Sequence, residues 1–327
     1  MNSWRCTICM FVFFAIFHYN GCLGCLEEER VALWKIKAST KWNLTDCRLS
    51  PFCTWVDDKT SDCCTWERVE CSNTTGRVIQ LSLHKTYILN SEEYNQFMDV
   101  SLYTPFEELQ HLDLSYNIAH WEIEDLERLS KLKKLEVLDL GSNVFVNRSN
   151  TAPSIPTKVL FSNKSDKSTV PFLGELKSLK TLIVSYNNLA GSLSDFAKVV
   201  TNLSNLEVLD LSRNNLDDFP DLRNMSKLKI LDLSRNNFSG RIPPSLWSLN
   251  SLEVLSLGDS NTKDSISRFC ELTRLQELDL SGNKFEGILP PCLNNLTSLR
   301  MVDFSYNQLS GKIPSSLTSN LTSLDFT

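Results

Sequence analysis

Few residues in this chain of 327 are placed for catalysis. Three histidines follow the first 24 residues (His84, His111 and His120), and none belongs to a Gly-x-Ser-x-Gly, phosphate-loop or metal motif. Paired carboxylates can perform general acid–base catalysis, but the recurring aspartates are evenly spread, as in a repeat. They are Asp113, Asp139, Asp210, Asp232, Asp279 and Asp303. The sequence therefore predicts no enzyme, no metal centre and no cofactor.

The cysteines predict covalent cross-links in the first part of the chain. Six of the eleven cysteines are Cys25, Cys47, Cys53, Cys63, Cys64 and Cys71. An even set ahead of a leucine-rich region suits a disulfide-stapled cap that shields the first leucines from water. A zinc site is the alternative, but adjacent Cys63 and Cys64 with no histidine nearby do not offer tetrahedral spacing.

Two later cysteines, Cys270 and Cys292, stand about one repeat apart. A bridge along the outer surface is one interpretation, and two small buried thiols are the other. The distance between the two Cα atoms decides, because a separation above ~7 Å excludes a disulfide.

The N-terminus has the features of a secretion signal covering residues 1–24. Arg5 precedes an apolar run from Ile8 to Phe17, and Cys22 and Gly24 are small residues suited to cleavage. This run is shorter than the ~20 residues that cross a bilayer, and no second stretch of that length follows. We therefore expect a secreted chain with no membrane span; a buried N-terminal helix is the alternative.

A leucine pattern then dominates the chain. Leu206-x-x-Leu209-Asp-Leu211-x-x-Asn214 returns at Leu228–Asn236, Leu252–Ser260, Leu275–Asn283 and Leu299–Asn307, and earlier at Leu109–Asn117, Leu135–Asn143 and Leu179–Asn187. From residue 214 the last position recurs at 236, 260, 283 and 307, intervals of 22, 24, 23 and 24 residues. This period is typical of leucine-rich repeats.

The pattern predicts an α/β fold, a right-handed leucine-rich-repeat solenoid with a parallel β-sheet on its concave face. Each Leu-x-Leu makes a short strand with both leucines inward, and the asparagine bonds backbone groups at the turn. A strand at Val78–Leu83 opens the sheet, so residues 25–77 form the cap and residues 78–327 hold about nine repeats. An amphipathic helix or coiled coil is excluded by Pro243, Pro290 and Pro314, which recur in the repeats.

One interval is about a repeat too long. Asn143 and Asn187 are 44 positions apart, and the segment 144–171 is rich in Ser, Thr, Asn, Lys and Pro. We expect it to loop out of the solenoid. It is either a tolerated glycosylated insertion or a contact loop beside the sheet.

Nine Asn-x-Ser/Thr sequons support secretion. They are Asn43, Asn73, Asn147, Asn163, Asn202, Asn224, Asn237, Asn295 and Asn320. Four of them, Asn202, Asn224, Asn295 and Asn320, stand immediately before the apolar residue that opens a coil. Sugars there would form a stripe on an outer surface and leave the sheet bare for contact.

Comparison of the repeats with one another predicts where a ligand would bind. Positions that recur, such as Asp between the leucines and Ser after them, serve the coil, while variable outward positions can serve a ligand. An apolar surface flanked by Tyr and Arg has the composition of a binding hot spot. The alternative is that β-branched residues occur here because they suit strands in general. The candidates are Tyr186, Val208, Arg213, Ile230, Arg235 and Val254.

The formal net charge of −6 is unremarkable, and no basic patch carries interleaved aromatic residues. Nucleic acid is therefore not an expected partner.

The cap resembles that of plant leucine-rich-repeat receptor-like proteins. The resemblance lies in Cys63-Cys64-Thr-Trp66-Glu-Arg-Val69-Glu-Cys71, in the helix-like Glu27–Trp34, in Thr75–Ile79, in Leu102–Asn117 and in the Gly-x-Ile/Leu-Pro steps. It implies the disulfides Cys25–Cys63 and Cys64–Cys71, which leaves Cys47 to pair with Cys53. Such receptors continue through further repeats, a second cysteine cap, a membrane helix and a short tail. This sequence stops inside a coil without a C-terminal cap, as expected of the front part of an ectodomain or of a shortened relative.

The resemblance implies the extracellular, ligand-binding part of a plant cell-surface receptor-like protein. It would bind a peptide or protein in defence or developmental signalling and act through a partner receptor kinase. The expected location is the secretory pathway and then the outer face of the plasma membrane, or the cell-wall space if no membrane helix follows. The alternative is a secreted inhibitor resembling polygalacturonase-inhibiting proteins, but these carry a C-terminal cysteine cap.

Overall fold

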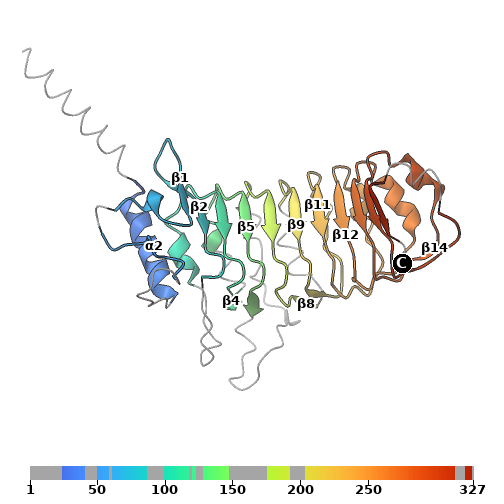
Figure 1. Ribbon diagram of the computed structural model, residues 1–327, viewed down its shortest axis with the longest axis horizontal. Coiled ribbons are helices and arrows are strands. Elements are labelled where there is room, and N and C mark those ends of the chain that lie inside the picture. Colours follow the sequence, from blue (N-terminus) through green and yellow to red (C-terminus); the bar gives the residue numbers. More distant parts are fainter. Residues whose placement is uncertain are drawn as a thin grey trace, which may run out of the picture.

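The computed structural model describes residues 24–40, 50–58, 61–86, 99–117, 120–122, 128–146, 175–191, 203–313 and 321–325. Within them eleven strands form one sheet, and Figure 1 shows these strands side by side along the long axis. In sheet order they are β1 (Val69–Cys71), β2 (Val78–Ser82), β3 (His111–Asp113), β5 (Val137–Asp139), β7 (Thr181–Ile183), β9 (Val208–Asp210), β11 (Ile230–Asp232), β12 (Val254–Ser256), β13 (Glu277–Asp279), β15 (Met301–Asp303) and β17 (Ser323–Asp325). The β1–β2 pair is antiparallel and the later pairs are parallel, so the predicted solenoid is confirmed.

The leucines of the repeat form the core. From β3 to β15 the central residue of each main-sheet strand points inward and pairs with its counterpart in the next coil, as Leu209 does with Leu231 and Leu231 with Leu255. These three side chains are fully buried. Because every coil supplies one such residue, each coil is stabilised mainly by its two neighbours.

A ladder of asparagines closes the coils, as the sequence predicts. The Asn236 side chain donates from Nδ2 to the carbonyls of Leu211 and Leu233, both at 3.0 Å. Its Oδ1 accepts from the backbone N–H of Leu216 at 3.1 Å. One buried amide therefore satisfies polar backbone groups of two adjacent coils. Ser260 takes this position in the coil of β12, where it donates to the Leu257 carbonyl.

Short second strands lie on the other side of the coils. They form three two-stranded parallel pairs: β4 (His120–Glu122) with β6 (Val144–Val146), β8 (Ala190–Gly191) with β10 (Asn215–Leu216), and β14 (Glu286–Ile288) with β16 (Gln308–Ser310). The expectation that the chain loops out from residue 144 is wrong for its first three residues, because β6 pairs with β4. Residues 147–171 lie outside the described residues.

The coils on either side of the long interval are neighbours in the main sheet. β5 pairs directly with β7, with Val137 opposite Thr181. The asparagine ladder also runs straight across, because the Asn143 N–H donates to Asn187 Oδ1 at 3.1 Å. The main sheet is therefore continuous across the long interval.

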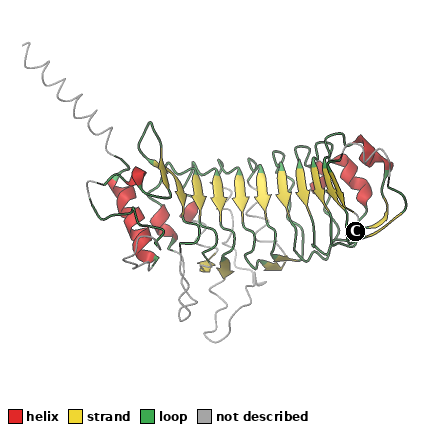
Figure 2. Ribbon diagram, in the orientation of Figure 1, coloured by secondary structure: helices red, strands yellow, loops and turns green. Residues whose placement is uncertain are grey.

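Helical turns flank the row of strands, as Figure 2 shows at both of its ends. They are η1 (Cys63–Thr65), η2 (Val100–Tyr103), η5 (Leu246–Ser248), η6 (Ile266–Glu271) and η7 (Pro291–Asn295). Their buried aromatic residues fill the coil interiors; Phe269 packs edge-on against both Trp247 and Phe285.

The cap is built on α2 (Glu27–Ser39), which begins with three glutamates. Acidic residues favour a helix N-terminus because the backbone dipole is positive there. Leu33 and Ile36 of this helix are fully buried, as are Phe52 and Trp55. These side chains cover the core at the β1 end of the sheet (Figure 1).

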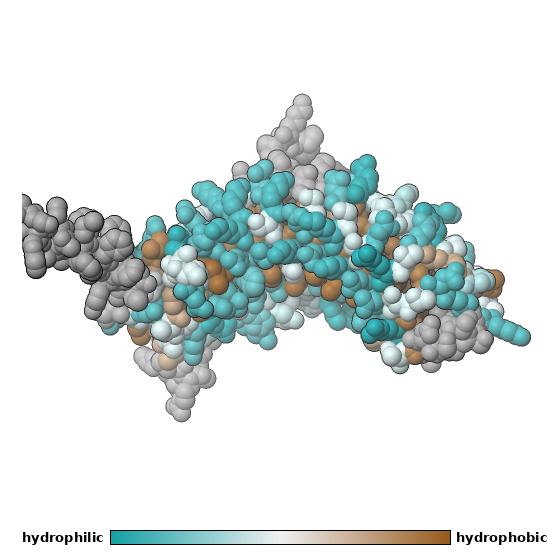
Figure 3. All heavy atoms as spheres, turned by 90° about the horizontal axis from the view of Figure 1, so that it is seen from above, coloured by the Kyte–Doolittle hydropathy of each residue, from teal (hydrophilic) through white to brown (hydrophobic). Residues whose placement is uncertain are grey.

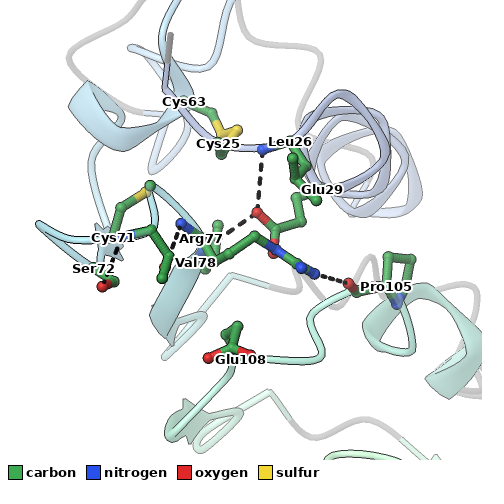
Figure 4. A network of polar contacts seen from close by, with 12 residues as sticks. Cys25, Leu26, Glu29, Cys63, Cys71, Ser72, Arg77, Val78, Pro105 and Glu108 are labelled. Carbon is green, nitrogen blue, oxygen red and sulfur yellow. Dashed lines mark hydrogen bonds and ion pairs between the residues drawn. A yellow bond between two sulfur atoms is a disulfide. The ribbon is translucent and has the colours of Figure 1, made fainter. Parts of the chain in front are cut away.

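A buried ion pair joins α2 to the first coil (Figure 4). The Glu29 carboxylate is fully buried and accepts a hydrogen bond from Nε of Arg77 at 2.8 Å. It also accepts the backbone N–H of Val78 at 3.2 Å and that of Leu26 at 3.3 Å. Arg77 in turn donates to the Pro105 carbonyl at 3.4 Å. One carboxylate thus connects the helix, the first parallel strand and the turn after η2.

Candidate ligand-binding surface

The concave face consists of rows, because each exposed position of one strand lies beside the same position of the next. We call the residue before the inward core residue the first row. Register places Val208, Ile230 and Val254 directly beside one another in this row. Ile230 is 38% exposed and its two neighbours are half-buried. The three apolar candidates therefore do form one stripe.

The stripe is longer than the sequence analysis indicated. Val137 and Thr181 continue the first row on β5 and β7. Beyond Val254 the row turns polar at Glu277 and then carries Met301, which is 45% exposed. Val137 was overlooked because its repeat is separated from the others by the long interval.

The second row holds the recurring aspartates, which serve the coil itself. Asp232 Oδ1 accepts the backbone N–H of Ser234 at 2.9 Å, and Asp210, Asp279 and Asp303 bond the residue two positions on in the same way. Burial raises the pKa of the Asp139 and Asp232 carboxyls, and neighbouring aspartates of the row raise both further. The row is a structural ladder, as its recurrence predicts.

Ile183 interrupts the aspartate row on β7. It pairs with Asp139 on one side and Asp210 on the other. A half-buried aliphatic side chain here places apolar surface next to the first-row residues Thr181 and Val208. The sequence alone shows this difference, because isoleucine stands in this repeat where most other repeats have aspartate.

The outermost row has a left-handed backbone. Its residues immediately precede the ladder asparagine or its equivalent, and all have φ between 52° and 61°. A left-handed conformation costs an L-residue roughly 1–2 kcal/mol. We call this set the left-handed row; it comprises Lys85, Tyr116, Ser142, Tyr186, Arg213, Arg235, Asp259, Gly282 and Tyr306.

The candidates Tyr186, Arg213 and Arg235 stand in this row on three adjacent coils, and all are exposed. Arg235 has Nε 3.8 Å from Asp259 Oδ2, a solvent-exposed pair. Arg213 is five positions beyond Val208 along the chain, at most roughly 16 Å if fully extended. The aspartate and serine positions lie between them.

The first two coils present a different surface. The His84 ring lies 5.0 Å from that of Tyr116, and its Nδ1 is 2.9 Å from Ser115 Oγ. His111 Nδ1 is 3.1 Å from Gln80 Oε1. Lys85 Nζ lies 5.2 Å from the centre of the Tyr116 ring. This end of the face is polar and aromatic, whereas the centre is aliphatic. His120 belongs to β4, outside the main sheet.

A ladder of alternating charges borders the first row, and the sequence analysis missed it. Lys180 contacts Glu136 at 2.7 Å and Lys229 contacts Glu207 at 2.6 Å, while Gln276 donates to Glu253 at 3.0 Å. These residues come immediately before the first-row residue of each coil. Figure 3, which looks down on the curved body, shows a largely hydrophilic surface with small scattered hydrophobic areas.

Disulfides join Cys25 to Cys63 and Cys64 to Cys71 in the cap. Cys53 is also disulfide-bonded, while Cys47, its expected partner, lies outside the described residues. Cys270 and Cys292 form a further bridge, with Cα atoms 5.9 Å apart, and it connects η6 to η7. The bridge, rather than two buried thiols, is therefore the arrangement found.

Four sequon asparagines are described, and Asn73, Asn224, Asn237 and Asn295 are all exposed. The other five, Asn43, Asn147, Asn163, Asn202 and Asn320, lie outside the described residues, as do residues 1–23 of the expected signal. Among the described residues no helix has the length and apolar character needed to span a membrane.

Family models agree with this architecture. The leucine-rich-repeat N-terminal domain model matches residues 26–72, the two-copy repeat model matches residues 177–224 and 204–246, and the single-repeat model matches residues 274–296 and 298–321. The chain belongs to the leucine-rich-repeat proteins.

Curated relatives include receptor-like proteins of Arabidopsis thaliana. Receptor-like protein 9a is 38% identical over 201 residues, 61% of this chain and 18% of the relative. Receptor-like protein 13 is 32% identical over 273 residues, 78% of this chain and 23% of the relative. The chain thus spans about a fifth of the length of these relatives.

Solved structures with a similar fold include two ectodomains of Arabidopsis receptor kinases. HAESA, in complex with the peptide hormone IDA and the co-receptor SERK1, has a TM-score of 0.67 and 26% identity, covering 92% of this chain and 49% of HAESA. GASSHO1/SCHENGEN3, in complex with CASPARIAN STRIP INTEGRITY FACTOR 2, has a TM-score of 0.65 and 26% identity. The match covers 91% of this chain and 35% of the GASSHO1/SCHENGEN3 chain.

Proposed function

We propose that this chain is the extracellular ligand-binding part of a plant cell-surface receptor, and that its concave face binds a peptide or protein. The observation that carries the proposal is the contrast between rows. The aspartate and asparagine positions repeat from coil to coil because they bond the coil, while the first row and the left-handed row vary and point outward. Variation at exposed positions on a rigid sheet suits recognition.

The similar structures support the class of ligand. The receptor kinase HAESA binds a peptide hormone together with a co-receptor. We extend this to a peptide ligand and a partner receptor kinase for the full-length form of this chain, in defence or developmental signalling. The first row from Val137 to Val254, aliphatic except for Thr181, would supply apolar contact area, since buried apolar surface contributes about 25 cal/mol per Å².

The proposal includes secretion and glycosylation. Disulfides in the cap and exposed sequon asparagines suit an oxidising compartment. Expression of the full chain in plant cells should yield a protein in the apoplastic fluid without residues 1–24. Treatment with an N-glycosidase should lower its mass, and retention inside the cell with an intact N-terminus would contradict this part.

Peptide binding is tested with the secreted full chain and a random 12-residue peptide library displayed on phage. The wild type should enrich peptides, and Ile230→Asp should abolish the enrichment by placing a charge in the apolar stripe. Lys284→Asp, an exposed position outside the strands, is the control. Equal enrichment by wild type and Ile230→Asp would exclude the concave face. Inhibition of polygalacturonase without any peptide enrichment would favour a secreted inhibitor instead.

A further inference from the structure

The left-handed row carries side chains that its own backbone disfavours. Glycine is the residue that adopts positive φ without a steric cost. It occurs once in the row, at Gly282, while tyrosine occurs three times and arginine twice. Asparagine and aspartate are the other residues that tolerate this conformation, and the row contains one of them, Asp259.

The coil itself imposes this conformation, whatever the side chain. The backbone N–H of Tyr186 donates to the Ser212 carbonyl at 3.0 Å, and that of Arg213 donates to the Ser234 carbonyl at 2.9 Å. Gly282 makes the same bond to Ser305 at 3.0 Å. The coil-to-coil hydrogen bond is therefore present with or without a side chain, and glycine would serve the backbone at least as well.

The side chains of the row also bury little surface. Tyr186 is 60% exposed and Tyr306 is 76% exposed. Arg235 and Asp259 have side chains 53% and 61% exposed, and an exposed ion pair at 3.8 Å contributes little to stability. Packing within the coil therefore does not explain why these bulky residues occupy strained positions. Strain that the fold does not need is typical of functional positions.

We propose that the left-handed row sets the selectivity of the peptide site, with Arg213 and Arg235 binding an acidic group of the ligand beside Tyr186. The inference rests on the proposed function. The two guanidinium groups come from adjacent coils at the same position, so their backbones are about 4.8 Å apart. Guanidinium groups bind carboxylates through paired hydrogen bonds, and a neighbouring tyrosine offers an aromatic surface and a hydroxyl.

Carboxylates already on this face compete only weakly for the arginines. Arg235 has an exposed partner in Asp259, with Nε 3.8 Å from Oδ2, a pair that a ligand carboxylate can displace. Asp210 and Asp232, in the same coils as the arginines, each accept the N–H of a following serine through Oδ1. The aliphatic stripe lies across the face, on the far side of these aspartates. A peptide lying along the solenoid can therefore place apolar side chains on the stripe and an acidic group on the arginines.

The first experiment measures thermal stability and needs no ligand. Tyr186→Gly and Arg213→Gly in the secreted full chain should each raise Tm by about 1–3 °C, because glycine relieves the strain. Ser212→Gly is the matched control, since it lies one position away with no left-handed backbone, and it should lower Tm. A fall in Tm for both left-handed variants would show that their side chains stabilise the coil, and the inference would be wrong.

The second experiment measures selectivity with the 12-residue peptide library. Peptides enriched by the wild type should contain more Asp and Glu than the starting library. The double variant Arg213→Glu/Arg235→Glu should enrich Lys and Arg instead, and Lys284→Glu should behave as wild type.

The outcomes separate the two proposals. If Ile230→Asp abolishes enrichment but the double arginine variant selects the same peptides as wild type, the peptide site stands and the role of the row is wrong. If the wild type enriches no peptide, the proposed function fails and the inference fails with it.

Discussion

The interior of the solenoid and its concave surface follow opposite rules. Inside, leucines and asparagines repeat, and each ladder amide bonds two coils at about 3 Å. On the surface, the first row changes from Val208 to Glu277, and the left-handed row changes from Arg235 to Gly282. The residues that join coils cannot vary without loss of stability, whereas the surface positions can. A solenoid can therefore change its ligand while keeping its fold.

The largest expected effect is at the cap, where no preceding coil seals the interior. Arg77→Met leaves the fully buried Glu29 carboxylate without its cation, so we expect a loss of about 3–4 kcal/mol. Chemical denaturation measures this loss. The double variant Glu29→Gln/Arg77→Met should recover part of it, and Glu28→Gln, an exposed position on the same helix, is the control. A single variant as stable as wild type would show that the ion pair does not hold the cap.

Asn236→Ala should cost about 3 kcal/mol, because it leaves two carbonyls and one N–H without their buried partner. Asn250→Ala, at an exposed position before β12 of the next coil, should cost less than about 0.5 kcal/mol. Hydrogen exchange should show faster exchange at Leu216, whose N–H bonds the lost side chain. Equal losses for the two variants would show that buried ladder positions and exposed positions tolerate substitution alike.

Gly282→Ala adds a Cβ to a left-handed backbone, and this Cβ also meets the Asp259 carboxylate, so the measured loss includes the displacement of that side chain. Gly282 has φ of 61°, and we expect the added methyl group to destabilise the chain by about 1 kcal/mol. Gly240→Ala is the matched control, because a Cβ there meets no atom within 4 Å and no positive φ is involved. Thermal melts compare the two, and equal Tm values would mean that the row carries no strain.

The smallest expected effect concerns Asp232, whose raised pKa means that its charge opposes folding at neutral pH. This penalty is present above the folded-state pKa and disappears as the pH falls through it. Asp232→Asn should therefore raise Tm by roughly 1 °C at pH 7 and have no such effect below about pH 3. Asn can still accept the Ser234 N–H. Asp217→Asn, in an exposed loop, is the control, and a gain that persists at low pH would point to another cause.

The repeating part of the fold was predictable from sequence because each structural requirement of a coil selects one residue type at a repeated position. Leucine at the inward position and asparagine at the turn identify both the strands and their register. The direct pairing of β5 with β7 could be expected from the matched Asn143 and Asn187. The second strand β6 could not, because three residues without a periodic pattern carry no signal that distinguishes a strand from a loop.

The surface was only partly predictable. Register placed Val208, Ile230 and Val254 in one stripe, as their spacing indicated. The left-handed backbone of Tyr186 and Arg213 was missed, because these residue types seldom adopt positive φ and only Gly282 gives a hint in the sequence. The charge ladder of Glu207 and Lys229 was missed because it depends on contacts between coils rather than within one repeat.

The junction of β5 with β7 shows how such a molecule can acquire new parts. Asn143 and Asn187 bond each other although 44 positions separate them, about twice the usual interval. The entropic cost of closing a loop grows only with the logarithm of its length, about 0.6 kcal/mol for a doubling. The stability of the sheet therefore depends little on the number of residues between β5 and β7. Gene rearrangement, or an engineer inserting a small folded module, can lengthen a coil at this point and leave the neighbouring coils in place.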